Sequence, residues 1–406
     1  RNHRYGRLLS LTARRNSKRA TMLHVLGNLK KLFSIRRLSI DCFVFRLHHQ
    51  LTVLVLVVFA VLVTTKQYVG DPIDCDRSSG VPAGVINVYC WIHATYSVKS
   101  LFANADGKRI VYPGVGNGAD FTDREDVKYH KYYQWVCLVL FFQALCFYVP
   151  RWLWKAWEGG RLKTLVQSLE YHVVLEPDAK RQRTDLLVRY LLSNLGSQDL
   201  YVWKYFTCEA LALFNVVGQL FFIDVFLDGE FLTYGLEVLS FVSSDEDRVD
   251  PMVRVFPRVA KCHFHKFGSS GNVETHDAVC VLPLNIVNEK IYVFLWFWFV
   301  LLAALTVALL IQRVLLASSR TLRSRALHYR FHMVPAKDLR QVLDSGSLGD
   351  WFLLYLMGQN MEARTFAQVI AELADHLREE PNQRTLPTGD QSSEKMKYGL
   401  VPVQDV

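Results

Sequence analysis

Four long apolar runs divide a chain that is otherwise rich in polar and charged positions. Residues 51–65, 132–149 and 291–312 contain no charged residue, and residues 205–227 contain only Glu209 and Asp224. A bilayer core about 30 Å thick is crossed by roughly 20 helical residues at about 1.5 Å each. We therefore predict four membrane-spanning helices, at 47–68, 132–152, 205–227 and 291–312, in preference to buried helices of a soluble protein.

Lysine and arginine are distributed unevenly among the segments between these runs. Residues 1–50 hold 12 basic residues and one acidic residue, Asp41, whereas residues 228–290 hold six basic and ten acidic residues. Excess basic charge marks the cytosolic side of a membrane protein. It is found in 1–50, 150–204 and the tail after Gln312. Both termini are therefore expected in the cytosol, with 66–131 and 228–290 outside.

The cysteines follow the same division. Cys75 and Cys90 lie in the first outer segment, and Cys262 and Cys280 lie in the second. Disulfides persist in oxidising compartments, so these four are expected to be paired. Four cysteines allow three connectivities, and their spacing does not choose among them. The remaining four are expected to be apolar packing residues in or beside the spans: Cys42, Cys137, Cys146 and Cys208.

Apolar residues at spacings of three and four predict further helices outside the spans. They occur in 161–170, 181–195, 336–343, 349–357 and 362–378. Residues 261–265 alternate between polar and apolar, which predicts a short strand. The predicted fold class is mainly α: a four-transmembrane-helix membrane protein with a helical cytosolic domain and a small disulfide-tied α/β extracellular domain.

The net charge of +9 could indicate a nucleic-acid partner, but the positions of the charges along the chain argue against one. Residues 1–21 carry seven positive charges and no negative charge, which leaves 9 − 7 = +2 for the rest of the chain. We interpret 1–21 as a basic extension that is non-native or disordered. The remaining excess is divided by side of the membrane, so we expect no nucleic-acid partner.

These patterns predict an organisation along the whole chain. In order, the expected parts are the extension 1–21, an N-terminal segment 22–46, the first span 47–68, an extracellular loop 69–131, the second span 132–152, a cytoplasmic helical loop 153–204, the third span 205–227, an extracellular loop 228–290, the fourth span 291–312, a cytoplasmic helical tail 313–380 and a polar, disordered tail 381–406.

The sequence carries little that is typical of an enzyme. It contains no HExxH, GxSxG or CxxC motif. His263 and His265 are two residues apart with His276 nearby, and they could share a metal ion, but exposed strand histidines are the favoured interpretation. We expect no catalytic residue, no metal and no cofactor.

The charges within the spans also argue against a transporter. Glu209 and Asp224 are expected near the ends of the third span, where they reach water at the headgroups. A proton-coupled transporter would place ionisable groups near the midplane, beside helix-breaking residues. Pro150 is expected to end or bend the second helix rather than mark a binding site. A pore built between subunits fits the pattern better.

Several short motifs resemble those of the innexins, the invertebrate gap-junction channel proteins, and in particular insect-like members. The family signature Tyr-Tyr-Gln-Trp-Val stands at Tyr132, Tyr133, Gln134, Trp135 and Val136, at the start of the second span. Further similar stretches are QYVGDPIDC at 67–75, YCWI at 89–92 and GDWFLL at 349–354. Connexins carry three cysteines in each outer loop where this chain has two, and pannexins lack the signature. The resemblance extends over residues 22–380.

The resemblance implies a subunit of a ring-shaped hemichannel of about eight copies, homo- or hetero-oligomeric, in the plasma membrane. Such a ring docks head to head with a ring of the neighbouring cell at a gap junction, and ions and small metabolites pass by diffusion. It also implies that Cys75 pairs with Cys280 and Cys90 with Cys262, which would hold both outer loops as one docking surface.

The resemblance further implies that 22–46 folds into the pore. The candidate pore-lining residues are Met22, Leu23, His24, Lys66 and Gln67. Two alternatives remain: a non-junctional hemichannel that releases metabolites from single cells, and an adhesive junction protein that does not conduct.

Overall fold

The computed structural model describes residues 38–76, 82–102, 112–116, 126–166, 177–243 and 250–384. The chain divides into two compact units. We call the described residues within 41–157 and 205–312 the membrane unit, and those within 37–40, 158–204 and 313–384 the helical unit.

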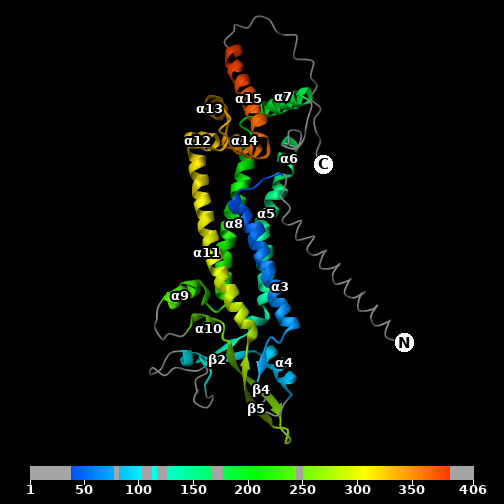
Figure 1. Ribbon diagram of the computed structural model, residues 1–406, viewed down its shortest axis with the longest axis vertical. Coiled ribbons are helices and arrows are strands. Elements are labelled where there is room, and N and C mark those ends of the chain that lie inside the picture. Colours follow the sequence, from blue (N-terminus) through cyan, green and yellow to red (C-terminus); the bar gives the residue numbers. More distant parts are fainter. Residues whose placement is uncertain are drawn as a thin grey trace, which may run out of the picture. The chain divides into compact units, whose positions relative to one another are not determined.

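Four long helices carry the predicted spans. The first is formed by α2 (Phe43–Arg46), the π-helical turn η1 (Leu47–Thr52) and α3 (Val53–Val69), and the others are α5 (Val136–Glu158), α8 (Asp199–Phe226) and α11 (Pro283–Ser318). All four are long and apolar enough to cross a membrane. Within the membrane unit they run side by side (Figure 1), around a core that includes Leu56, Leu140, Val216 and Phe299.

The two segments expected outside the cell, 69–131 and 228–290, are called the outer segments. They form a five-stranded antiparallel sheet in the order β1-β5-β4-β2-β3. Its strands are β1 (Asp74–Cys75), β2 (Thr95–Val98), β3 (Val127–His130), β4 (Val259–Phe267) and β5 (Val273–Val281), and the 3₁₀ turns η2 (Lys99–Phe102) and η5 (Tyr132–Gln134) lie beside them. Helix α4 (Ala83–His93) packs on the sheet through Ile86 and Cys90. The predicted strand at 261–265 is confirmed within β4.

The second outer segment also holds two helices that the sequence pattern does not predict, α9 (Phe231–Ser243) and α10 (Pro251–Val255). The run FLTYGLEVLSFVS of α9 is apolar on more than one face. In such a helix the pattern does not single out one buried side.

The helical unit is built from short helices around a separate core. They are α6 (Arg161–Val166), α7 (Pro177–Ser193), α12 (Arg320–Arg330), α13 (Ala336–Ser345), α14 (Leu348–Asn360) and α15 (Ala363–Arg384). Trp351 and Phe352 of α14 and Val369 and Ile370 of α15 are buried. The helices predicted at 181–195, 336–343, 349–357 and 362–378 are confirmed, and α6 covers the described part of 161–170. The predicted fold class is confirmed.

The structure corrects local expectations at three positions. Helix α5 continues through Pro150 to Glu158, so the proline does not end it. Helix α15 continues past Glu380 to Arg384, and the rest of the tail and residues 1–37 lie outside the described residues. The side chain of Glu209 does not reach water: it is fully buried, with Oε1 3.3 Å from the Cys42 sulfur, because the start of the first long helix covers it.

Candidate functional site

Two disulfides tie the first outer segment to the second. Cys75 of β1 is bonded to Cys280 of β5, and Cys90 of α4 is bonded to Cys262 of β4, over sequence separations of 205 and 172 residues. These are the pairings that the resemblance implies. Closing such long loops removes much of the conformational freedom of the unfolded chain.

The two bridges lie next to each other in the small core of the sheet. The sulfur atoms of Cys75, Cys90 and Cys280 lie within 4.8 Å of one another, and all three residues are buried. A metal-binding cysteine must offer a thiolate, which a disulfide sulfur does not. The cluster therefore holds the two outer segments together and is not a metal site.

The family signature joins α4 to the start of α5. The amide Nε2 of Gln134 donates to the carbonyls of Trp91 and Ile92, at 3.3 Å for Ile92. These carbonyls belong to the last turn of α4, where a helix leaves its C=O groups without partners. Gln134 therefore caps the C-terminal end of α4.

Three of the other signature residues, Tyr132, Tyr133 and Val136, pack in the cores of the sheet and of the long helices. The Tyr133 ring lies 4.7 Å from that of Trp91, and its hydroxyl donates to the carbonyl of Cys90. Tyr133 is buried in the core of the sheet and Val136 in the core of the long helices. Tyr132 packs against both cores, and Trp135 is exposed. The signature thus fixes the disulfide-tied sheet to the long helices.

Two of the five candidate pore residues, Lys66 and Gln67, lie within the described residues. Met22, Leu23 and His24 lie outside the described residues. Lys66 is exposed and Gln67 half-buried near the C-terminal end of α3. Lys66 lines an open groove with Leu62, Thr65, Val69, Gly70 and Val287.

The strand histidines take part in cross-strand pairs between β4 and β5. His263 Nδ1 lies 2.6 Å from Asp277 Oδ1, and His265 Nδ1 lies 3.2 Å from Thr275 Oγ1. The buried Lys261 donates to Asp277 Oδ2 at 3.1 Å. Partial burial of Asp277 opposes its ionisation, but the Lys261 and His263 contacts outweigh burial and lower its pKa. These side chains stabilise the hairpin.

A buried ionic cluster at the start of the first long helix is missed by the sequence pattern. Asp41 Oδ2 lies 2.8 Å from His49 Nε2 and 3.1 Å from Arg151 Nη1, and all three side chains are buried. The one available signal is that Asp41 is the only acidic residue among the first fifty. The cluster ties α5 to the start of the first long helix.

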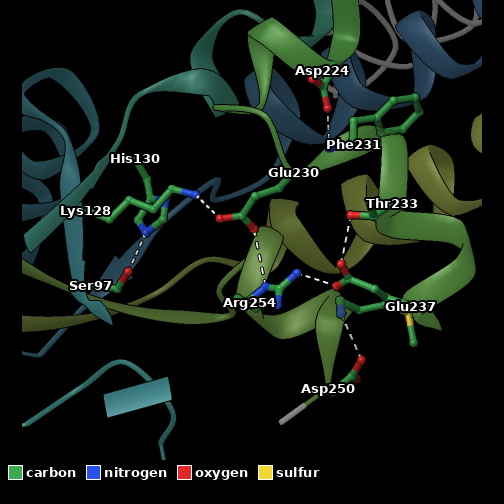
Figure 2. Close-up of polar contacts among 11 residues, drawn as sticks. Ser97, Lys128, His130, Asp224, Glu230, Phe231, Thr233, Glu237, Asp250 and Arg254 are labelled. Atoms are coloured by element: carbon green, nitrogen blue, oxygen red, sulfur yellow. Dashed lines mark hydrogen bonds and ion pairs between the residues drawn. The ribbon is translucent and has the colours of Figure 1, made fainter. Parts of the chain in front are cut away.

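A second polar network, drawn in Figure 2, joins β3, α9 and α10. Glu230, just before α9, lies between Lys128 Nζ at 2.7 Å and Arg254 Nε at 3.5 Å. Arg254 also pairs with Glu237 of α9, whose Oε1 accepts from Thr233 at 2.8 Å. Each of these two cations has an acidic partner, so the network holds α9 against β3 and α10.

Comparison with known proteins agrees with these features. The model of the Innexin family matches residues 41–377. Innexin shaking-B of Drosophila melanogaster is 48% identical over 357 residues, which are 88% of this chain and 95% of that protein. Innexin inx2 of the same species is 49% identical over 354 residues, 87% of this chain and 95% of that protein. Innexin inx2 of Schistocerca americana is 48% identical over 357 residues, 88% and 98% of the two chains. With the tied outer segments and the four long apolar helices, these matches show that the chain belongs to the innexin family, the subunits of gap-junction channels.

Proposed function

We propose that this innexin closes into a ring of about eight copies and that the ring docks head to head with a ring of the adjacent cell. The observation that carries the docking step is the double tie between the outer segments. Cys75–Cys280 and Cys90–Cys262 join 69–131 and 228–290 through one sheet. A rigid, pre-organised surface loses little conformational entropy when it meets its partner, which favours docking between cells.

The orientation rests on the distribution of charge. The segments with excess basic residues, 1–50, 150–204 and the tail after Gln312, face the cytosol, and both chain termini lie there. The disulfides support this orientation, because 69–131 and 228–290 would then lie in the oxidising space outside the cell.

The pore is lined by the N-terminal segment 22–46, including Met22, Leu23 and His24, and by Lys66 and Gln67 at the outer end of α3. The exposure of Lys66 supports its part in this wall. Ions and small metabolites diffuse through such a pore, because conduction requires that each contact with the wall is weak enough for the solute to leave.

Conductance between paired cells tests the junctional channel. Cells that express the chain should pass current to each other when paired, and a membrane-impermeant tracer should cross with the current. Current in single cells without coupling between paired cells would support the non-junctional hemichannel instead. Adhesion without current in single or paired cells would support the adhesive junction protein. Native mass measurement of the solubilised ring checks the number of copies.

A further inference from the structure

Helix α9 leaves α8 through a rigid turn. The Asp224 carboxylate accepts hydrogen bonds from the backbone N–H groups of Phe231 and Leu232, both at 2.9 Å, and so caps the start of α9. Asp228 and Gly229 have φ of 58° and 82°, and the N–H of Gly229 donates to the Asp224 carbonyl at 2.8 Å. The direction in which α9 leaves α8 is therefore set by the fold.

Two hydrogen bonds hold the first turn of α9 against α11. The indole N–H of Trp296 donates to the Leu232 carbonyl at 3.0 Å, and the Tyr234 hydroxyl donates to the Glu289 carbonyl at 3.3 Å. Positions 289 and 296 are separated by about 10 Å along a helix. The charge-free run of α11 begins at residue 291, just after Glu289 and Lys290. Helix α9 thus lies where charged residues give way to the apolar span.

Three faces of α9 have different surroundings. Tyr234, Gly235 and Val238 are buried on the side that meets α11 and Phe256. Thr233 and Glu237 form a polar flank that meets Arg254 (Figure 2). Leu232, Leu236 and Leu239 fall on one remaining face, since a helix turns by about 100° per residue. Their exposed fractions are 39%, 60% and 56%.

We propose that this leucine face, Leu232, Leu236 and Leu239, is a lipid-binding surface that lies in the outer leaflet of the bilayer. An interfacial helix of this kind buries its apolar face at the boundary of headgroups and acyl chains. Its occupant is the acyl region of ordinary phospholipid, because α9 carries no basic residue to select an anionic headgroup.

The leucine face also continues the apolar surface of the spans. Val225, near the end of α8, is 79% exposed and precedes Leu232 by one tight turn. Phe294 and Phe297, on either side of Trp296 in α11, are also exposed. A membrane that covers these span residues therefore meets α9 at the level of Trp296. The contact would anchor the disulfide-tied sheet beside the membrane, since Glu230 links α9 to Lys128 of β3.

Site-directed spin labelling tests this surface in the assembled full chain, reconstituted in phosphatidylcholine nanodiscs. The free cysteines at positions 42, 137, 146 and 208 are first replaced by serine or alanine, with retained conductance as the control for that background. A nitroxide at Leu236→Cys should collide several-fold more often with oxygen than with a water-soluble nickel chelate. Lys266→Cys, on the exposed end of β4, is the matched aqueous site and should show the opposite preference.

Two results would overturn the proposal. A preference for the nickel chelate at position 236 would place the leucine face in water. Low accessibility to both reagents would mean that a second copy of the chain covers it. A photoreactive diazirine side chain at position 236, in a chain with its cysteines unchanged, checks the same point independently: phospholipid adducts are expected, and adducts to another subunit would contradict the proposal.

Discussion

Gly235 of α9 lies directly against the indole ring of Trp296 on α11, and a Cβ at position 235 would overlap that ring. The same indole donates its N–H to the Leu232 carbonyl, one turn away on α9. Glycine costs about 0.5–1 kcal/mol relative to alanine inside a helix. That cost is offset here by the close approach that it permits between the two helices.

Gly235→Ala should therefore destabilise the protein by about 1–3 kcal/mol, because the added methyl group overpacks a site with no free space. The midpoint of thermal unfolding in detergent measures the loss. Gly84→Ala is the matched control, since Gly84 lies in α4 and a methyl group added there would meet no other atom within 4 Å. It should be neutral or slightly stabilising, and equal stability of the two variants would contradict the packing account.

Gln134→Leu should remove the cap on α4. The carbonyls of Trp91 and Ile92 would lose their donor, at a cost of about 0.5–1.5 kcal/mol, because these contacts are only partly buried and water can reach them. We expect a lower unfolding midpoint and less protein at the cell surface. Trp135→Phe, at the exposed neighbouring position, should change neither. A normal midpoint for Gln134→Leu would mean that water replaces the amide.

The double substitution Cys90→Ser with Cys262→Ser should abolish coupling between paired cells, because the outer segments lose one of their two ties. Removing a native disulfide costs about 2–5 kcal/mol. Junctional conductance and surface biotinylation together separate loss of docking from loss of the protein. Cys146→Ser, a free cysteine in α5, should couple normally. Full coupling of the double variant would refute the role of this tie.

His130 should make stability depend on pH. Burial, helped by Lys128, lowers its pKa from 6.5 to about 3, and Ser97 Oγ lies 2.7 Å from its Nε2. Below pH 6.5, His130 binds a proton in the unfolded chain but stays neutral in the folded chain. The contribution of His130 to the free energy of unfolding is therefore fully present above that pH. It falls by about 1.4 kcal/mol per pH unit as the pH is lowered towards 3. The unfolding midpoint should fall less steeply from pH 7 to 4.5 in His130→Asn than in the parent chain. Parallel curves for the two proteins would show that His130 does not cause the pH dependence.

Asp350→Asn should loosen the helical unit. One carboxylate oxygen, Oδ2, accepts from the N–H groups of Ser347 at 2.8 Å and Gly196 at 2.7 Å. It thus caps α14 and holds the loop before α8. Losing the charge should cost about 0.5–2 kcal/mol, as for other helix caps. Limited proteolysis should cut the variant faster, and Asp344→Asn, near the end of α13, serves as a control that should match the parent.

The sequence alone determined the spans, the four cysteines that form disulfides and the family. Runs without charge such as 291–312 are unambiguous because a bilayer penalises almost every other composition. The signature at Tyr132–Gln134 could be recognised, but not what Gln134 does, since its partners Trp91 and Ile92 lie about forty positions earlier. The expectation that Glu209 reaches water was wrong because its burial beside Cys42, just before α2, is a contact that no local pattern records.

Only the tertiary structure decided the position and faces of α9. Its apolar residues cover a wider arc than the side that packs on α11, so periodicity could not say which of them are buried. Trp296, Glu289 and Arg254, distant in sequence, assign one face to α11 and one to α10, and so leave the leucine face open. Composition decides that a segment belongs near a membrane, whereas long-range contacts decide which of its side chains meet it.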